Sequence, residues 1–358
     1  MEIIRIEEIN STNKNSSNFT EILYINPTLK QCFDVIMIIV LIVIMLSMGC
    51  AISIKEVLLH IKKPIGVSCG MISQFVLMPL SGFGFSQAFK LRASYATGVL
   101  VICCCPGGVL SNTFTYFCDG DLALSVTMTT ASTLLALGFL PLNMWIYGQN
   151  LETDNLIIPY DKIALSLVYI ASPVLVGMLL RWKVRRIAYY VTKFGSYSGI
   201  GLVFFCIILQ IVMFPSMFDL VPWKLYLAVV LLPTLGLGIG YGLAAIFRQS
   251  LPARKTIAYE CGLQNVPLAL NIISISFKHH QQVEIVVFPS LYGFSMVTSA
   301  SIACVFYQCY KKWIQTKKVE EKDIADAEDV IKEFIPKTKE NGVMLETSTQ
   351  ISDHSQLY

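Results

Sequence analysis

Residues 259–267 read YECGLQNVP and place a carboxylate, Glu260, and two amides inside a long apolar run. A carboxylate at the centre of a bilayer costs at least about 2.5 kcal/mol, and polar groups there usually mark an ion or substrate pathway. Gly262 and Pro267 weaken the helical hydrogen-bond ladder, which predicts a broken helix whose freed carbonyls can bind a cation. The alternative is that Glu260 pairs with a neighbouring Lys or Arg, although none lies within this stretch.

A second interruption lies in the apolar run 93–118, where Pro106, Gly107 and Gly108 follow three consecutive cysteines. Proline followed by two glycines does not continue a straight helix. Taken alone, such a sequence is also typical of a plain kink in a membrane helix. Two interruptions, each close to an Asn or Gln, favour a shared polar site.

The composition indicates a polytopic membrane protein. Hydrophobic residues make up 54% of the chain and charged residues 14%, and the mean hydropathy is +0.62. Soluble chains carry about 25% charged residues. The net charge of +3 is too small to suggest a nucleic-acid partner. The eleven cysteines show no paired spacing around histidines, so neither a zinc site nor a disulfide framework is indicated, and no residue pattern suggests an enzyme.

Hydropathy predicts nine transmembrane helices. They are expected at residues 31–53, 65–89, 93–118, 122–147, 162–181, 194–215, 223–247, 256–278 and 284–310. The interrupted spans are the third and the eighth, five apart. This spacing suggests an inverted repeat of two five-helix units, the first lacking its opening helix, whose broken helices cross at the midplane.

Basic residues and glycosylation sequons orient the chain. The loops after the first, fifth, seventh and ninth spans hold fifteen Lys and Arg residues. Three N-x-S/T sequons, at Asn10, Asn15 and Asn18, lie in the polar N-terminal tail. Both observations predict an extracellular N-terminus and a cytoplasmic C-terminus at the plasma membrane.

The expected organisation has three parts. No basic segment precedes an apolar one at the N-terminus, so no cleaved signal peptide is expected. Residues beyond about 320 are acidic and poor in large apolar side chains, which is typical of disorder, although a short helix over 324–334 fits the sequence. The parts are a glycosylated extracellular tail at 1–30, a nine-helix membrane domain at 31–315 and a disordered cytoplasmic tail at 316–358.

Further polar residues within the spans are candidates for the same site. Ser125 and Thr129 are four residues apart and share one helix face. Their hydroxyls can supply oxygens to a cation, or can bond back to the preceding helical turn. Gln74 is the other strong amide within a span.

Several short motifs together carry a family resemblance. They are Phe33 through Ser47-Met48-Gly49-Cys50, His60 to Pro64, Gln74 to Pro79, Cys104 to Gly108 followed by Ser111 and Asn112, Asp119-Gly120-Asp121, Met128 to Thr130, Ile158 to Asp161, and Glu260-x-Gly262-x-Gln264-Asn265. With these motifs the chain resembles the sodium-dependent bile acid symporter family over roughly residues 30–315.

The resemblance implies a core domain and a panel domain, with two sodium ions behind the crossing of the broken helices. The first sodium site would be formed by Ser111, Asn112, Ser125, Thr129 and Glu260. The second would be formed by Gln74, Glu260, Gln264 and the carbonyls of Cys261 and Leu263. The crossing and the substrate vicinity would hold Pro106, Gly107, Gly108, Asn265 and Pro267. Oxygen ligands of these kinds suit a hard cation.

The function that this resemblance implies is sodium-coupled symport of an amphipathic organic anion into the cell by alternating access. The expected partners are sodium, the anion and the lipid bilayer, with no cofactor besides the coupling ions. Pro267, Leu268-Ala269-Leu270 and Ser295 to Thr298 depart from the bile acid carriers on the side that resembles the substrate face. The anion is therefore a bile acid, a sulfated steroid or another amphipathic anion. The alternatives are a non-transporting receptor of the same fold and a proton-coupled carrier.

Overall fold

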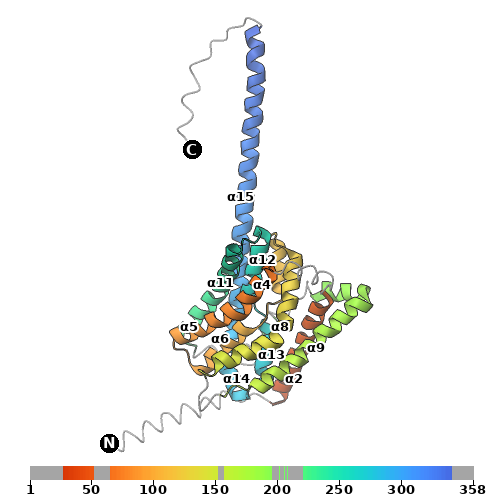
Figure 1. Cartoon of the computed structure of the whole chain (residues 1–358), viewed down its shortest axis with the longest axis vertical. Coiled ribbons are helices and arrows are strands. Elements are labelled where there is room, and N and C mark those ends of the chain that lie inside the picture. Colours follow the sequence, from red (N-terminus) through yellow and green to blue (C-terminus); the bar gives the residue numbers. More distant parts are fainter. Residues whose placement is uncertain are drawn as a thin grey trace, which may run out of the picture. The chain divides into compact units, whose positions relative to one another are not determined.

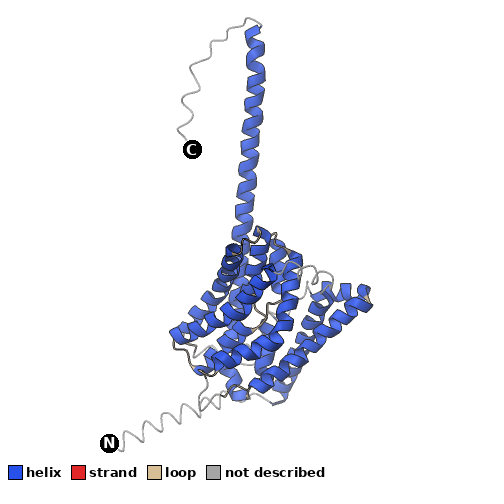
Figure 2. Ribbon diagram, viewed as in Figure 1, coloured by secondary structure: helices blue, strands red, loops and turns tan. Residues whose placement is uncertain are grey.

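The computed structural model describes residues 27–51, 65–151, 157–195 and 221–340, together with residues 201, 205 and 208. Within these residues all regular structure is helical, as predicted, apart from one isolated bridge between Gly107 and Gln264 (Figure 2). The sequons at Asn10, Asn15 and Asn18, most of the predicted sixth span and residues 341–358 lie outside the described residues.

The uninterrupted spans in the described part have helices within a few residues of the predicted positions (Figure 1). The second of these spans, predicted at 65–89, is continuously helical but contains a single π-helical turn between α4 and α5. These helices are α2 (Pro27–Ala51), α4 (Ile65–Ile72) continued by η1 (Ser73–Leu77) and α5 (Met78–Ala88), α8 (Leu122–Gly148), α9 (Tyr160–Lys183) and α11 (Trp223–Ile246).

The third and eighth predicted spans are each divided into two helices, as the sequence predicts. They are α6 (Ala93–Cys104) with α7 (Leu110–Phe117), and α12 (Leu251–Gly262) with α13 (Val266–Ser276). α12 begins before the predicted residue 256 because Ser250 caps it, accepting a hydrogen bond from Ala253 N at 3.4 Å. Its first turns carry Arg254 and Lys255, and these charged residues lower the local hydropathy, so the predicted span began later than the helix does.

Five helices in the described part of the chain are long and apolar enough to cross a membrane. They cover residues 65–88, 122–148, 160–183, 223–246 and 281–327. The apolar stretches Ile38–Ala51, Ala93–Cys104 and Val266–Ser276 are shorter than the roughly 20 residues that a single helix needs to span a bilayer. The chain is a multi-pass membrane protein, and the count of nine spans stays a prediction.

The last helices differ from the predicted C-terminal boundary. α14 (His279–Ile285) precedes α15 (Val287–Glu340), which is helical through residues 316–340, where the sequence predicts a disordered tail. Opposite charges one turn apart, such as Lys317 with Glu321, support an exposed helix without an apolar face. The chain divides into two compact units, residues 1–304 and 305–358, and α15 contributes to both.

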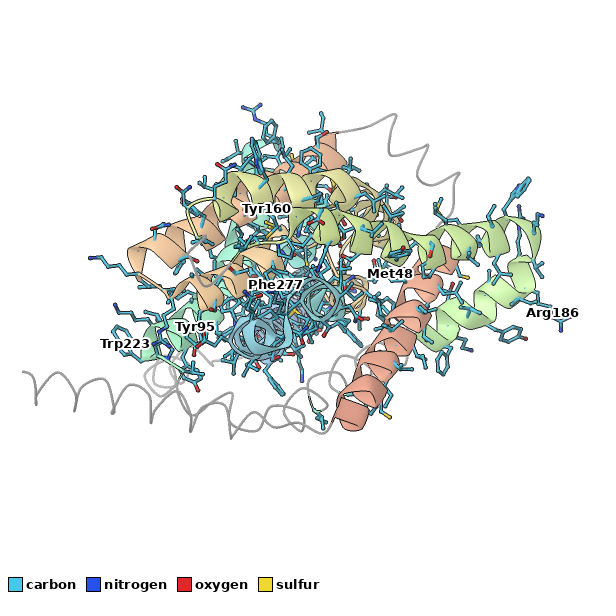
Figure 3. The ribbon with its side chains drawn as sticks, turned by 90° about the horizontal axis from the view of Figure 1, so that it is seen from below. Met48, Tyr95, Tyr160, Arg186, Trp223 and Phe277 are labelled. Carbon is cyan, nitrogen blue, oxygen red and sulfur yellow. The ribbon has the colours of Figure 1, made fainter. Side chains whose placement is uncertain are left out.

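Within the first unit, α2 packs along α9 and α11 packs along α12. Glycines allow the close approach of α2 and α9, since a Cβ on Gly49 would lie 2.9 Å from the Cα of Gly177. Trp223, at the start of α11, and Arg186, beyond the end of α9, lie on opposite sides of this unit (Figure 3). α4, η1, α7 and α8 also contact α12.

Candidate functional site

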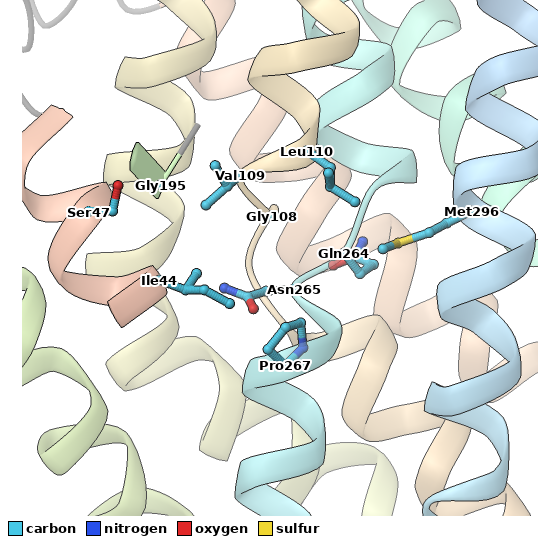
Figure 4. A pocket seen from close by; sticks show the side chains of 10 residues that line it. All are labelled: Ile44, Ser47, Gly108, Val109, Leu110, Gly195, Gln264, Asn265, Pro267 and Met296. Atoms are coloured by element: carbon cyan, nitrogen blue, oxygen red, sulfur yellow. The ribbon is translucent and has the colours of Figure 1, made fainter. Parts of the chain in front are cut away.

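The two interruptions meet and pair through their backbones. The N–H of Gly108 donates to the carbonyl of Leu263 at 2.8 Å, and the N–H of Asn265 donates to the carbonyl of Pro106 at 3.0 Å. Figure 4 shows Gly108 beside Gln264 and Asn265. Each unwound segment therefore supplies partners for backbone groups that the other exposes, which is required where water is absent. The two broken helices therefore meet at their interruptions, and a crossing at the midplane of the membrane stays a prediction.

Glycine permits this close approach. A Cβ on Gly107 would lie 2.6 Å from Cδ of Glu260, and a Cβ on Gly108 would lie 3.0 Å from the carbonyl oxygen of Gln264. A methyl group at Gly107 would overlap the Glu260 carboxylate, and one at Gly108 would press against backbone atoms of Gln264. The two glycines thus let the backbone of the third span lie directly against α12.

Glu260 is wholly buried beside the crossing. Its Oε2 accepts hydrogen bonds from Ser111 Oγ at 2.6 Å and from Thr129 Oγ1 at 3.0 Å. Its Oε1 has no hydrogen-bond partner. No Lys or Arg of the described residues forms an ion pair with Glu260. A buried carboxylate without a counter-charge is costly, and the alternative of a neighbouring basic side chain finds no support among the described residues.

Hydroxyl and amide groups extend this first cluster. Ser125 Oγ donates to Asn112 Oδ1 at 2.7 Å, and Thr115 Oγ1 lies 3.4 Å from Ser125 Oγ. Thr129 Oγ1 is also 3.0 Å from the carbonyl of Ser125. Its single proton is therefore shared between the back-bond to the preceding turn and Glu260, which are the two roles that the sequence allows. All five residues predicted for the first site are brought together by α7, α8 and α12.

A second cluster joins Gln74 to the two unwound segments. Gln74 Nε2 donates to the carbonyl of Cys105 at 2.5 Å and to Gln264 Oε1 at 2.6 Å. Gln264 Nε2 donates to the carbonyl of Cys261 at 2.9 Å. Gln74 Oε1 is buried and has no hydrogen-bond partner. Gln74, Gln264 and Cys261 thus meet, while the carbonyl of Leu263 accepts from Gly108. Glu260, also predicted for this site, makes its hydrogen bonds in the first cluster.

Comparison with known proteins decides the family. A family model described as the Sodium Bile acid symporter family matches residues 38–221. The ileal sodium/bile acid cotransporter of Homo sapiens is 37% identical over 333 residues, which cover 93% of this chain and 90% of that protein. This chain belongs to the sodium bile acid symporter family. The sodium-dependent organic anion transporter of Bos taurus is 34% identical over 292 residues, covering 81% of this chain and 77% of that protein.

Membership of this symporter family confirms the resemblance that the motifs carry. The family is one of transporters and not of enzymes. The relatives do not by themselves assign a substrate, because those of Homo sapiens and Bos taurus are named for bile acids and for organic anions respectively.

Two residues of this symporter-family site escaped the sequence analysis. Tyr292 of α15 is wholly buried, and its hydroxyl donates to the carbonyl of Gly262, the last residue of α12, at 3.0 Å. Nothing in its apolar span distinguishes Tyr292 from a core residue. Thr115 lies four residues after Ser111 on α7, and that spacing on one helix face could have identified it.

Two cavities adjoin the crossing on the side of α2. The smaller, about 20 Å³, is lined by residues that include Ile44, Gly108, Asn265 and Pro267 (Figure 4). It has room for about one water molecule. The larger, about 120 Å³, is lined both by polar residues, including Asn112, Thr129, Thr130 and Thr133, and by apolar residues, including Met48, Val126 and Val174.

Proposed function

We propose that this chain is a secondary active transporter that carries an amphipathic organic anion into the cell together with sodium. The observation that carries the proposal is the buried Glu260 carboxylate, whose Oε1 has no partner at the crossing of two broken helices. The similarity to a sodium/bile acid cotransporter and to a sodium-dependent organic anion transporter supports the same function.

The first cluster is suited to a sodium ion. Glu260 Oε1 supplies the negative charge, and Asn112 Oδ1 supplies an amide oxygen with a second lone pair. The hydroxyls of Ser111, Ser125 and Thr129 can donate their protons to neighbouring acceptors and still direct lone pairs at the ion. The set offers oxygen and no sulfur, as a hard cation requires.

The second cluster is suited to a second sodium ion. Gln74 Oε1 is buried without a partner, so it has both lone pairs available. The carbonyls of Cys261 and Leu263 each accept one hydrogen bond and keep one lone pair. Glu260 contributes its charge from the residue before Cys261. One carboxylate thus offsets part of the charge of both ions, and the other residues of the two clusters have no negative charge with which to replace it.

The coupling of sodium to the anion follows from residues shared between the ion site and the larger cavity. Asn112 and Thr129 belong to the first cluster and also line this cavity. Sodium that orders these side chains therefore also shapes the wall that the anion contacts, so the ion acts as a ligand for the substrate-competent state. The core and panel domains then move relative to each other in alternating access.

The larger cavity has the mixed polar and apolar lining that an amphipathic anion requires, but its volume is too small for a steroid. It measures about 120 Å³, whereas sites for drug-sized ligands are about 300–1,000 Å³. The wall formed by Met48 of α2 and Val174 of α9 must therefore move away from the crossing to admit a steroid. The hydroxyl and amide side chains of the lining would receive the polar groups of the anion, and the apolar side chains would contact its rings.

The sodium gradient supplies enough free energy for concentrative uptake. If two sodium ions accompany one monovalent anion, a tenfold sodium gradient contributes about 1.4 kcal/mol for each ion. Moving the one net charge through about 60 mV adds roughly 1.4 kcal/mol. The total of about 4 kcal/mol supports close to thousandfold accumulation.

The test is uptake of labelled bile acids and sulfated steroids by cells that express the chain, in sodium buffer and in choline buffer. We expect at least one anion to be taken up in sodium and not in choline. A receptor of the same fold predicts no sodium-dependent uptake of any of them. A proton-coupled carrier predicts uptake that follows the external pH and is the same in both buffers.

Removing ligands from one site only should weaken sodium binding without abolishing it. Asn112→Ala and Gln264→Ala each delete an oxygen from a single cluster, whereas Glu260 serves both. We expect each variant to raise the sodium concentration for half-maximal uptake by about tenfold and to lower its Hill coefficient. Initial uptake rates across a sodium series measure both quantities. Unaltered sodium dependence in both variants would contradict the assignment of two sites.

The orientation predicts where the two termini are accessible. Glycosidase should shift the protein on a gel, and replacing Asn10, Asn15 and Asn18 together should remove that shift. An antibody should reach an epitope at Tyr358 only after the cells are permeabilised. Labelling of that epitope on intact cells would overturn the extracellular assignment of the N-terminus.

A further inference from the structure

The side chain of Gln74 reaches the crossing from an irregular helical turn. In η1 the N–H of Met78 donates to the carbonyl of Ser73, five residues earlier, instead of to the carbonyl four residues earlier. Such π-helical turns are rare and are frequent at functional sites. An inserted residue of this kind rotates the side chains around it. The turn therefore determines where the Gln74 amide points.

Pro79 leaves a backbone carbonyl beside Gln74 without its usual donor. In an α-helix the N–H of residue 79 would donate to the carbonyl of Phe75, but proline has no N–H. Asn143 of α8 replaces that donor, because its Nδ2 donates to the carbonyl of Phe75 at 2.9 Å. Asn143 is only 6% exposed. A buried amide thus compensates for a proline in another helix.

A second contact from α8 holds the same residue. The ring of Phe75 stacks on the ring of Phe139, with centroids 5.2 Å apart and an angle of 22° between the planes. Phe139 and Asn143 are four residues apart, so they lie on one face of α8. α8 therefore holds both the side chain and the carbonyl of the residue that follows Gln74.

We propose that Asn143 is a positioning residue for the second sodium site. By donating to Phe75 it maintains the π-helical turn, and the turn directs the unpartnered Gln74 Oε1 toward the ion. The inference rests on the sodium binding of the proposed function but not on transport. Outer partners of metal ligands typically change metal affinity by 10- to 100-fold when they are replaced.

The test measures sodium binding by the purified full-length protein in detergent. A ligand that binds only the folded state raises the Tm, so the Tm is followed as sodium chloride replaces choline chloride at constant ionic strength. Asn143→Leu removes the donor and keeps a similar volume. We expect it to raise the sodium concentration for the half-maximal Tm shift by roughly tenfold.

A matched control separates this effect from a general loss of stability. Gln282 is also a buried amide, and its Nε2 donates to the carbonyls of Ser274 and Phe277 at the other end of α13. Gln282→Leu should lower the Tm in choline but leave the sodium concentration for the half-maximal shift unchanged. An Asn143→Leu protein with the sodium midpoint of the unmutated protein would overturn the proposal.

A double variant distinguishes positioning from simple stabilisation. Pro79→Ala restores an N–H that can donate to Phe75 in α-helical register. In the double variant Asn143→Leu/Pro79→Ala we expect the Tm in choline to return to that of the unmutated protein. The sodium concentration for the half-maximal Tm shift should stay raised, because an α-helical turn would point the Gln74 amide in another direction. Recovery of both quantities would overturn the proposal. Absence of any sodium-dependent shift in the unmutated protein would overturn both the sodium sites and this inference, whereas a sodium shift without sodium-driven uptake would contradict only transport.

Discussion

Glu260→Gln is expected to abolish sodium-driven uptake while the protein still reaches the cell surface. Glutamine keeps the shape of the side chain and can still accept from Ser111 and Thr129 at one oxygen. The substitution removes the negative charge of Glu260, which is the only charge in the two clusters that can offset desolvated cations. Leaving a buried charge without its partner costs about 3–5 kcal/mol, which weakens sodium binding by more than about 100-fold. Glu260→Ala should have the same effect on uptake, with a greater loss of stability.

The measurement for Glu260→Gln is uptake in sodium and choline buffers, normalised to the amount of protein at the surface. Glu284→Gln is the matched control, because Glu284 lies on α14 in a partly exposed ion pair with Arg92 at 3.6 Å. Exposed pairs of this kind contribute about 0–1 kcal/mol, so Glu284→Gln should transport nearly normally. A well-expressed Glu260→Gln protein with unaltered sodium dependence would show that the crossing is not the ion site.

Gly107→Ala is the second substitution with a large expected effect, through shape instead of charge. The added Cβ would overlap the carboxylate of Glu260 and lie 2.6 Å from its Cδ. The carboxylate would have to leave Ser111 and Thr129, which separates it from the other oxygens of the first cluster. We expect sodium-dependent uptake to be lost and the free energy of unfolding to fall by about 1–3 kcal/mol, as is typical of overpacking.

Gly138→Ala is the matched control for this steric effect. A Cβ on Gly138 of α8 would meet no heavy atom within 4 Å in the described structure. Alanine is favoured over glycine by about 1 kcal/mol in a helix interior, so this variant should be at least as stable as the original and should retain uptake. Normal sodium-dependent uptake by Gly107→Ala would mean that the carboxylate is not needed in its observed place.

The crossing could be predicted from the sequence because polar residues are rare in membrane spans, where they are costly, and are therefore easily recognised. Glu260, Gln264 and Gln74 stand out in apolar spans, and the glycines and prolines beside them indicate where helices must break. The family resemblance then assigned these residues to two clusters. Hydrogen bonds connect the residues of the first cluster, and in the second they connect Gln74, Gln264 and Cys261, whereas Glu260 bonds within the first cluster. The alternative of a paired basic side chain is resolved only by the structure, since contacts between distant segments cannot be obtained from spacing alone.

Three other features could not be predicted from the sequence, each for a physical reason. The π-helical turn is contacted by Asn143 through a hydrogen bond to Phe75, and these two residues are separated by 68 positions in the sequence. Tyr292 has no polar neighbour in the sequence that marks its contact with Gly262. The helix over residues 316–340 was predicted as disordered because low hydrophobicity does not distinguish a disordered segment from an exposed charged helix.

The most direct test of the central claim is coupled flux in proteoliposomes that contain only the purified chain. Entry of radioactive sodium and of a labelled anion would be followed together, with the pH equal on both sides of the membrane. The proposed symport predicts that an inward sodium gradient concentrates the anion, that the anion accelerates sodium entry, and that Glu260→Gln loses both effects. Anion uptake that continues unchanged when choline replaces sodium, or that requires a pH gradient, would contradict it.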